Sequence, residues 1–87
     1  VWGDGDDCGA DLARRLRAEG VIRPLEDLLS RAQSLRPGTL IDARLHRERE
    51  HDTYVYEIHM LDGNGVLWEV EFDARSGEML ELELEDP

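Results

Sequence analysis

The residues from Tyr54 to Leu84 alternate between large apolar and acidic side chains with a period of two. This alternation is typical of half-buried antiparallel strands, which turn one face to a core and the other to solvent. The inward set is Tyr54, Tyr56, Ile58, Met60, Val66, Trp68, Val70, Phe72, Leu80, Leu82 and Leu84. The outward set is Glu57, Glu69, Glu71, Asp73, Glu81, Glu83 and Glu85. We therefore expect three hairpin-connected strands whose outer face is acidic.

The length of the chain, 87 residues, leaves room for one small domain with a thin core. A sheet with one apolar face needs a second layer to cover it. The expected fold class is therefore α+β, with an N-terminal helix or helix pair packed on one face of an antiparallel sheet of three to four strands. We expect a single domain over residues 10–87. Residues 1–9 are rich in Gly and Asp and are expected to form a disordered acidic arm.

The segment upstream of the strands supplies the covering helices. Leucines and Ala32 recur at helical spacing after Pro24, which predicts the main helix over residues 24–35, ended by Pro37-Gly38. A shorter helix is expected over residues 12–19, with Asp11 as its cap and Gly20 as its stop. A first strand follows over residues 39–50, with Ile41, Ala43 and Leu45 facing inward. The polar residues 46–52 predict a projecting, solvated hairpin.

The turns are constrained by register. If Met60 and Val66 both face the core, their hairpin needs an odd number of connecting residues, and we expect the five residues 61–65. By the same reasoning Phe72 faces Leu80. Gly77 then takes the left-handed position of a short loop over residues 74–77.

The negative charge is concentrated in the second half of the chain. Residues 1–50 hold nine Arg and ten acids, net −1, whereas residues 51–87 hold one Arg and eleven acids, net −10. An acidic surface repels phosphate backbones and anionic lipid, which argues against nucleic-acid binding. No apolar run is long enough to span a membrane. Basic protein surfaces and divalent cations remain as partners.

Three stretches resemble a known family. They are Tyr56-Glu57-Ile58, then Asp62-Gly63-Asn64-Gly65, then the run from Trp68 to Leu80 that contains Asp73-Ala74-Arg75-Ser76-Gly77-Glu78. The pattern is similar to the C-terminal half of the PepSY domain family, in which an alternating strand leads into Asp-Ala-x-x-Gly-Glu-Val. Met79 stands where Val is common. The resemblance covers about residues 20–84.

The resemblance implies a small extracytoplasmic α+β module that has no catalytic residues and restrains a secreted peptidase or acts in envelope signalling. It implies a bacterial periplasmic or secreted location, reached after removal of a signal peptide. The chain begins at Val1, and a natural mature terminus and an artificial boundary both fit that start. Cys8, the single cysteine, cannot form an internal disulfide. A homodimer through Cys8 or through a sheet edge stays open.

The candidate binding site is the acidic outer face, and its expected partner-binding residues are Glu57, Glu69, Glu71, Asp73, Glu81 and Glu83. No cofactor is expected, and no metal ligand is assigned. The alternative function is binding or sensing of a divalent cation, because calcium would relieve repulsion between neighbouring carboxylates. Asp62-x-Asn64 is better explained as a turn than as a calcium loop. His46, His51 and His59 lack metal-ligand spacing and are expected to be solvated.

The aromatic residues of the inward face offer a second surface to consider. Tyr54, Tyr56, Trp68 and Phe72 share that face and are expected to pack in the core. If the helix leaves one end of the sheet uncovered, some of these rings form an exposed patch instead.

Overall fold

The computed structural model describes residues 9–85 of the chain. Two helices precede four strands: α1 (Ala10–Ala18), α2 (Leu25–Leu35), β1 (Gly38–Glu48), β2 (Thr53–Asp62), β3 (Leu67–Asp73) and β4 (Met79–Glu85). Except for Gly9, the expected N-terminal arm lies outside the described residues, and so does Cys8. Gly9 is the N-terminal cap residue of α1, and Asp11, which we expected to be the cap, lies in the first helical turn.

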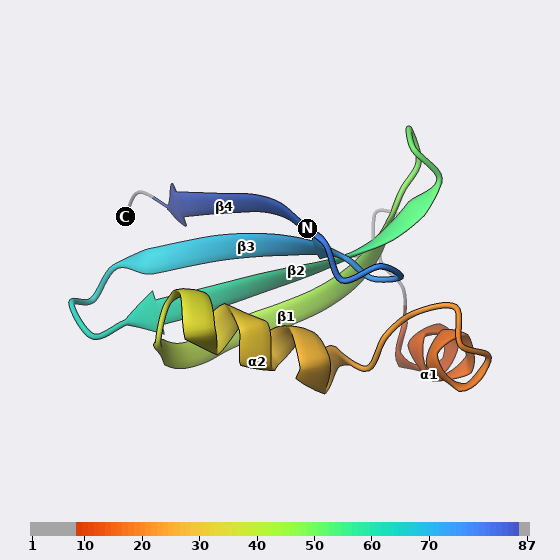
Figure 1. Cartoon of the computed structure of the whole chain (residues 1–87), viewed down its shortest axis with the longest axis horizontal. Helices are drawn as coiled ribbons and strands as arrows, with labels where there is room; N and C mark the ends of the chain where they lie inside the picture. Colours follow the sequence, from red (N-terminus) through yellow and green to blue (C-terminus); the bar gives the residue numbers. More distant parts are fainter. Residues whose placement is uncertain (1–8, 86–87) are drawn as a thin grey trace.

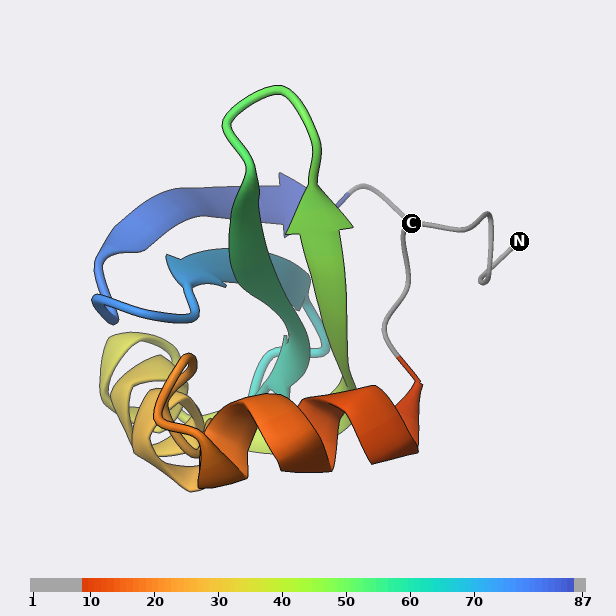
Figure 2. The same cartoon turned by 90° about the vertical axis from the view of Figure 1, so that its right-hand side faces the viewer.

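The four strands form one antiparallel sheet in the order β1-β2-β3-β4. In Figure 1 the strands fan out from β1 to β4 while α2 runs beside β1 and β2, far from β4. Figure 2 shows α1 and α2 on the same side of the sheet and the β1–β2 hairpin rising away from them. The α+β prediction is confirmed. The opposite side of the sheet, which we call the outer face, is not covered by either helix.

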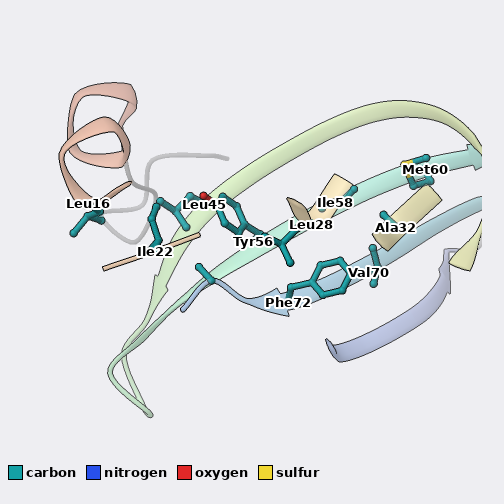
Figure 3. Packing of buried hydrophobic residues seen from close by; sticks show 11 residues of the cluster. Leu16, Ile22, Leu28, Ala32, Leu45, Tyr56, Ile58, Met60, Val70 and Phe72 are labelled. Carbon is teal, nitrogen blue, oxygen red and sulfur yellow. The ribbon is translucent and has the colours of Figure 1, made fainter. Parts of the chain in front are cut away.

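The core lies between the helices and the inner face of the sheet. Leu28 and Ala32 of α2 pack with Ile58, Phe72 and other buried residues of β2 and β3, while Leu16 and Ile22 extend the cluster toward α1 (Figure 3). The four rings of the inner face differ in burial. Tyr56 and Phe72 are buried, whereas Tyr54 and Trp68 are half-buried. The Arg36 guanidinium lies 4.2 Å from the Trp68 ring centroid.

A β-bulge in β1 makes one inward prediction wrong. Leu40 pairs with Met60, and Asp42 pairs with His59, so Ile41 is an extra residue with no partner opposite it. A bulge interrupts the alternation of side chains between the two faces. Ile41 is accordingly 53% exposed, while Ala43 and Leu45 face inward as expected.

A second bulge in β4 displaces Leu80. Glu71 pairs with Glu81 while Phe72 pairs with Met79, which leaves Leu80 as the extra residue. Our prediction that Phe72 faces Leu80 is therefore wrong, and Leu80 is 49% exposed. Leu82 and Leu84 keep the inner face beyond the bulge, opposite Val70 and Trp68.

The β2–β3 turn is tighter than expected. Met60 pairs with Trp68 rather than with Val66, and the Asp62 amide donates to the Val66 carbonyl at 2.9 Å. This hydrogen bond encloses the residues 63–65, an odd number but three rather than five, and β3 begins just beyond it, at Leu67. The Asp62 carboxylate accepts hydrogen bonds from the Asn64 and Val66 amides, which explains the shorter turn and confirms that this segment is a turn.

The β3–β4 loop binds the segment that leads into α2. The Asp73 carboxylate accepts hydrogen bonds from the Arg75 and Ser76 amides, and Ala74 is fully buried. Gly77 has φ 81°, the left-handed conformation that we expected for it, although the pairing of Phe72 differs from the expected one. Arg23 and Arg31 donate to the carbonyls of Arg75 and Gly77, respectively. The loop that contains the Asp-Ala-x-x-Gly-Glu motif therefore connects the helix layer to the sheet through hydrogen bonds.

Candidate functional site

The candidate site is the outer face of strands β2, β3 and β4. Two rows of side chains cross it: Glu57 lies opposite Glu71, which lies opposite Glu81, and His59 lies opposite Glu69, which lies opposite Glu83. Side chains directly opposite each other on one face lie about 5 Å apart at Cβ. We call Glu57, His59, Glu69, Glu71, Glu81, Glu83 and Glu85 the acidic face. The structure thus brings five of the six predicted partner-binding residues together.

The sixth predicted residue, Asp73, has a different role. One of its carboxylate oxygens accepts the two loop amides, and the other lies 3.2 Å from the Thr53 hydroxyl, which donates to it. These hydrogen bonds lower the pKa of Asp73 despite the opposing effect of burial. Its charge therefore contributes to the field of the outer face, but its oxygens are already engaged in holding the loop.

His59, which we expected to be solvated, lies instead among the carboxylates of the outer face. The His59 side chain is only 16% exposed, and its Nε2 and Nδ1 lie 2.9 Å and 3.0 Å from the carboxylates of Glu57 and Glu85. Burial lowers the pKa of His59, but the hydrogen bonds to Glu85 and Glu57 outweigh burial and raise it. The sequence does indicate that His59 lies on the outer face, because it is two residues after Glu57 in the same strand and alternate residues of a strand share a face.

Crowding of the carboxylates perturbs the protonation of the acidic face. Burial, a hydrogen bond to Glu71 and the charge of Glu57 raise the pKa of Glu69 to about 8. The pKa of Glu81 is also raised, first by its hydrogen bond to Glu83. Like charges held close together disfavour the ionised form of one member. At neutral pH Glu69 therefore holds its proton for much of the time.

This arrangement predicts that the domain becomes more stable on acidification from pH 8 to pH 5. The folded pKa of Glu69 lies above its ordinary value of 4.5, so the folded state binds more protons than the unfolded state between those values. The stabilisation is complete below pH 4.5 and is lost as pH rises toward 8. The raised pKa of His59 acts in the same direction above 6.5. The slope should stay below about 1.4 kcal/mol per pH unit, because solvent screens the partly exposed carboxyl.

Urea denaturation of the parent chain and of Glu69→Gln at both pH values checks this prediction. The amide cannot ionise, so the variant should exceed the parent in stability at pH 8 and match it at pH 5. The raised pKa of Glu69 is contradicted if the stability of the parent chain is the same at pH 5 and pH 8. It is also contradicted if the stability of Glu69→Gln depends on pH as steeply as that of the parent.

A groove of about 930 Å³ extends the acidic face toward the β1–β2 turn. Its lining includes Glu48, Glu71, Asp73 and the apolar residues Val55 and Leu80. Val55 belongs to the outer face by parity, yet it is only 2% exposed. The lining therefore combines apolar side chains with carboxylates, and it also includes Arg75. Apolar surface beside carboxylates suits the aliphatic stem and charged head of an Arg or Lys side chain.

Three side chains of the acidic face also have the chemistry of metal ligands. Ligand atoms of Glu57, His59 and Glu69 all lie within 4.8 Å of one another. One imidazole and two carboxylates suit zinc better than calcium, which prefers oxygen ligands alone. To bind a metal ion, His59 would have to lose a proton from one ring nitrogen. It would also have to break its hydrogen bond to Glu57 or to Glu85. His46 does not join this group, and His51 belongs to a second, more exposed group with Glu48 and Glu50 near the β1–β2 turn.

Over residues 9–85 the architecture defines a class: a small α+β domain in which two helices cover one face of an antiparallel meander and neither covers the other, acidic face. A family model described as "Peptidase propeptide and YPEB domain" matches residues 24–83, the segment from the start of α2 into β4. The chain belongs to this family, PepSY, and the resemblance seen in the sequence is confirmed.

Domains of the PepSY family are regulatory or propeptide-like modules. The helix α1 precedes the matched residues. Comparison with curated proteins and with solved structures gives no match. Neither helix among residues 9–85 has the length and apolar character needed to cross a membrane.

Proposed function

We propose that this chain is a noncatalytic extracytoplasmic module that binds another protein through its acidic face, and that the partner presents a basic surface. A secreted peptidase that the module restrains, or an envelope signalling protein, fits the regulatory character of the family. The periplasmic or secreted location in this proposal rests on the same family membership.

The observation that carries the proposal is the separation of the two sheet faces. The inner face and both helices form the core, so the fold uses one side of the sheet for packing. The other side holds glutamates in directly opposed pairs, Glu57 with Glu71 and Glu71 with Glu81, while Glu69, which keeps its proton for much of the time at neutral pH, lies opposite Glu83. Opposed like charges cost stability in a sheet. A basic partner would relieve this repulsion, so the charge that weakens the free domain favours the complex.

Electrostatics also predicts how the partner associates. A surface with one sign of charge accelerates encounter with an oppositely charged partner, and salt screens that effect. The association rate of a partner captured from the secreted or periplasmic fraction should fall about tenfold between low and high salt. The dissociation rate should change much less. Surface plasmon resonance across a salt series measures both rates, and an association rate that does not respond to salt contradicts the proposal.

A further inference from the structure

The strand β4 ends the sheet and leaves one edge open. Among residues 9–85 it pairs with β3 alone, and α2 lies over β1 and β2, toward the opposite edge of the sheet (Figure 1). An open edge presents backbone donors and acceptors that another strand can use. Among the described residues, β4 also holds three of the large exposed apolar side chains, with Met79 44%, Leu80 49% and Leu84 51% exposed.

The pairing pattern identifies which backbone groups of β4 face the open edge. The Asp62 amide bonds to the Val66 carbonyl, and hydrogen-bonded pairs alternate along an antiparallel ladder. Even-numbered residues of β3 therefore bond to β2, and odd-numbered residues bond to β4. The Asp73 amide, which donates to the Glu78 carbonyl, agrees with this parity. Glu81 and Glu83 therefore bond to β3, and the amides and carbonyls of Leu82 and Leu84 point to the open edge.

The charges of β4 select what can pair there. Glu81, Glu83 and Glu85 alternate with Leu82 and Leu84, so glutamates line its outer side and leucines its inner side. If two copies paired antiparallel through β4 with their outer faces on the same side, glutamate would lie opposite glutamate. Such like-charge pairs are destabilising, whereas opposite charges stabilise cross-strand pairs. A second copy of this chain is therefore disfavoured at this edge, and a basic strand is favoured.

We propose that β4 accepts an extended segment of the partner as a fifth antiparallel strand, and that this segment alternates basic and apolar residues. Its basic side chains lie beside the glutamates on the outer face, and its apolar side chains lie beside Leu82 and Leu84. Main-chain hydrogen bonds hold such a strand, and the side chains determine which strand binds. This inference rests on the proposed function, because it takes the partner to be basic.

The probe for this site is the seven-residue peptide Arg-Val-Arg-Val-Arg-Val-Arg. Opposite residues in an antiparallel pair point to the same face, so the valines lie opposite Leu82 and Leu84 and their amides point to β4. Methylating the valine amides should weaken binding about tenfold or more, because the two valines opposite Leu82 and Leu84 then no longer donate hydrogen bonds to β4. Methylating arginine amides, which point away from β4, is the matched control and should have little effect.

Hydrogen exchange of the backbone amides gives a second, independent readout. In the free chain the amides of Leu82 and Leu84 should exchange faster than those of Glu81 and Glu83, and the peptide should protect them. Leu84→Pro removes one backbone amide at the open edge and should weaken peptide binding. Leu84→Val keeps this amide and should leave peptide binding unchanged. Pro is tolerated in an edge strand at a position whose amide faces solvent.

The possible results separate this inference from the proposed function. If peptide binding depends on salt but is unchanged by valine methylation, the proposed strand addition at β4 is wrong. The proposal of a basic partner is then unaffected. Binding that is lost on valine methylation but does not respond to salt supports the strand addition and contradicts the basic partner. Absence of binding at millimolar peptide also overturns the strand addition.

Discussion

Replacing Phe72 with alanine should destabilise the domain by about 3–5 kcal/mol, the usual cost of emptying a buried aromatic site. Phe72 is 1% exposed and packs in the cluster that joins α2 to the inner face of the sheet. A small domain has roughly 5 to 10 kcal/mol of stability in total. The variant should therefore be close to its unfolding threshold at room temperature, as measured by urea denaturation.

Trp68→Ala is the matched control for Phe72→Ala. Trp68 is a larger residue on the same strand and the same face, but it is half-buried, with its indole nitrogen bonded to Asp62 at 2.9 Å. Its removal leaves less emptied volume in the core and should cost less than the removal of Phe72. A larger loss for Trp68→Ala would contradict the packing described here.

Reversing Glu69, Glu71 and Glu83 to lysine together should slow association with a basic partner by about tenfold or more, because the reversal removes the attractive field of the acidic face. Stability should change little, since substitutions at outward strand positions are usually worth about 0.5 kcal/mol or less. Lysine at position 71 would lie opposite Glu57 and Glu81, which relieves repulsion, whereas the lysines at positions 69 and 83 lie opposite each other and replace one pair of like residues with another. Stopped-flow association and thermal denaturation measure the two effects.

A second triple variant separates the acidic face from net charge. Glu19, Glu26 and Asp27 are exposed on the helix side of the molecule, and their reversal to lysine changes the formal net charge by the same amount. If both triple variants slow association equally, the partner responds to total charge and the acidic face is a solubility feature. If only Glu69, Glu71 and Glu83 matter, the face is the binding site.

Much of the fold could be predicted from the sequence because the apolar period is two in one half and helical in the other. The two β-bulges could not. A bulge adds a single residue without breaking the apolar pattern, so Ile41 and Leu80 looked like inward residues. The three-residue turn after Asp62 was missed for a related reason, since its length depends on hydrogen bonds from the Asp62 side chain to backbone amides.

The candidate site was predictable in outline but not in detail. Alternation alone placed Glu57, Glu69 and Glu71 on one face. It did not show that the Asp73 oxygens are engaged by the β3–β4 loop. Nor did it show that His59 lies between two carboxylates, because hydrogen bonds across strands depend on a register that the bulges alter.

The hydrogen bonds between the β3–β4 loop and the helix layer have a consequence for how the sequence of this fold can change. In this loop the family likeness is carried by Asp73, Ala74 and Gly77, and each of them serves an intramolecular contact or turn. Substitutions at Glu69, Glu71, Glu81 and Glu83 do not remove these contacts. Two chains can therefore share the whole loop motif and recognise unrelated proteins, and grafting a new pattern of charges onto β3 and β4 should redirect this scaffold without redesigning its core.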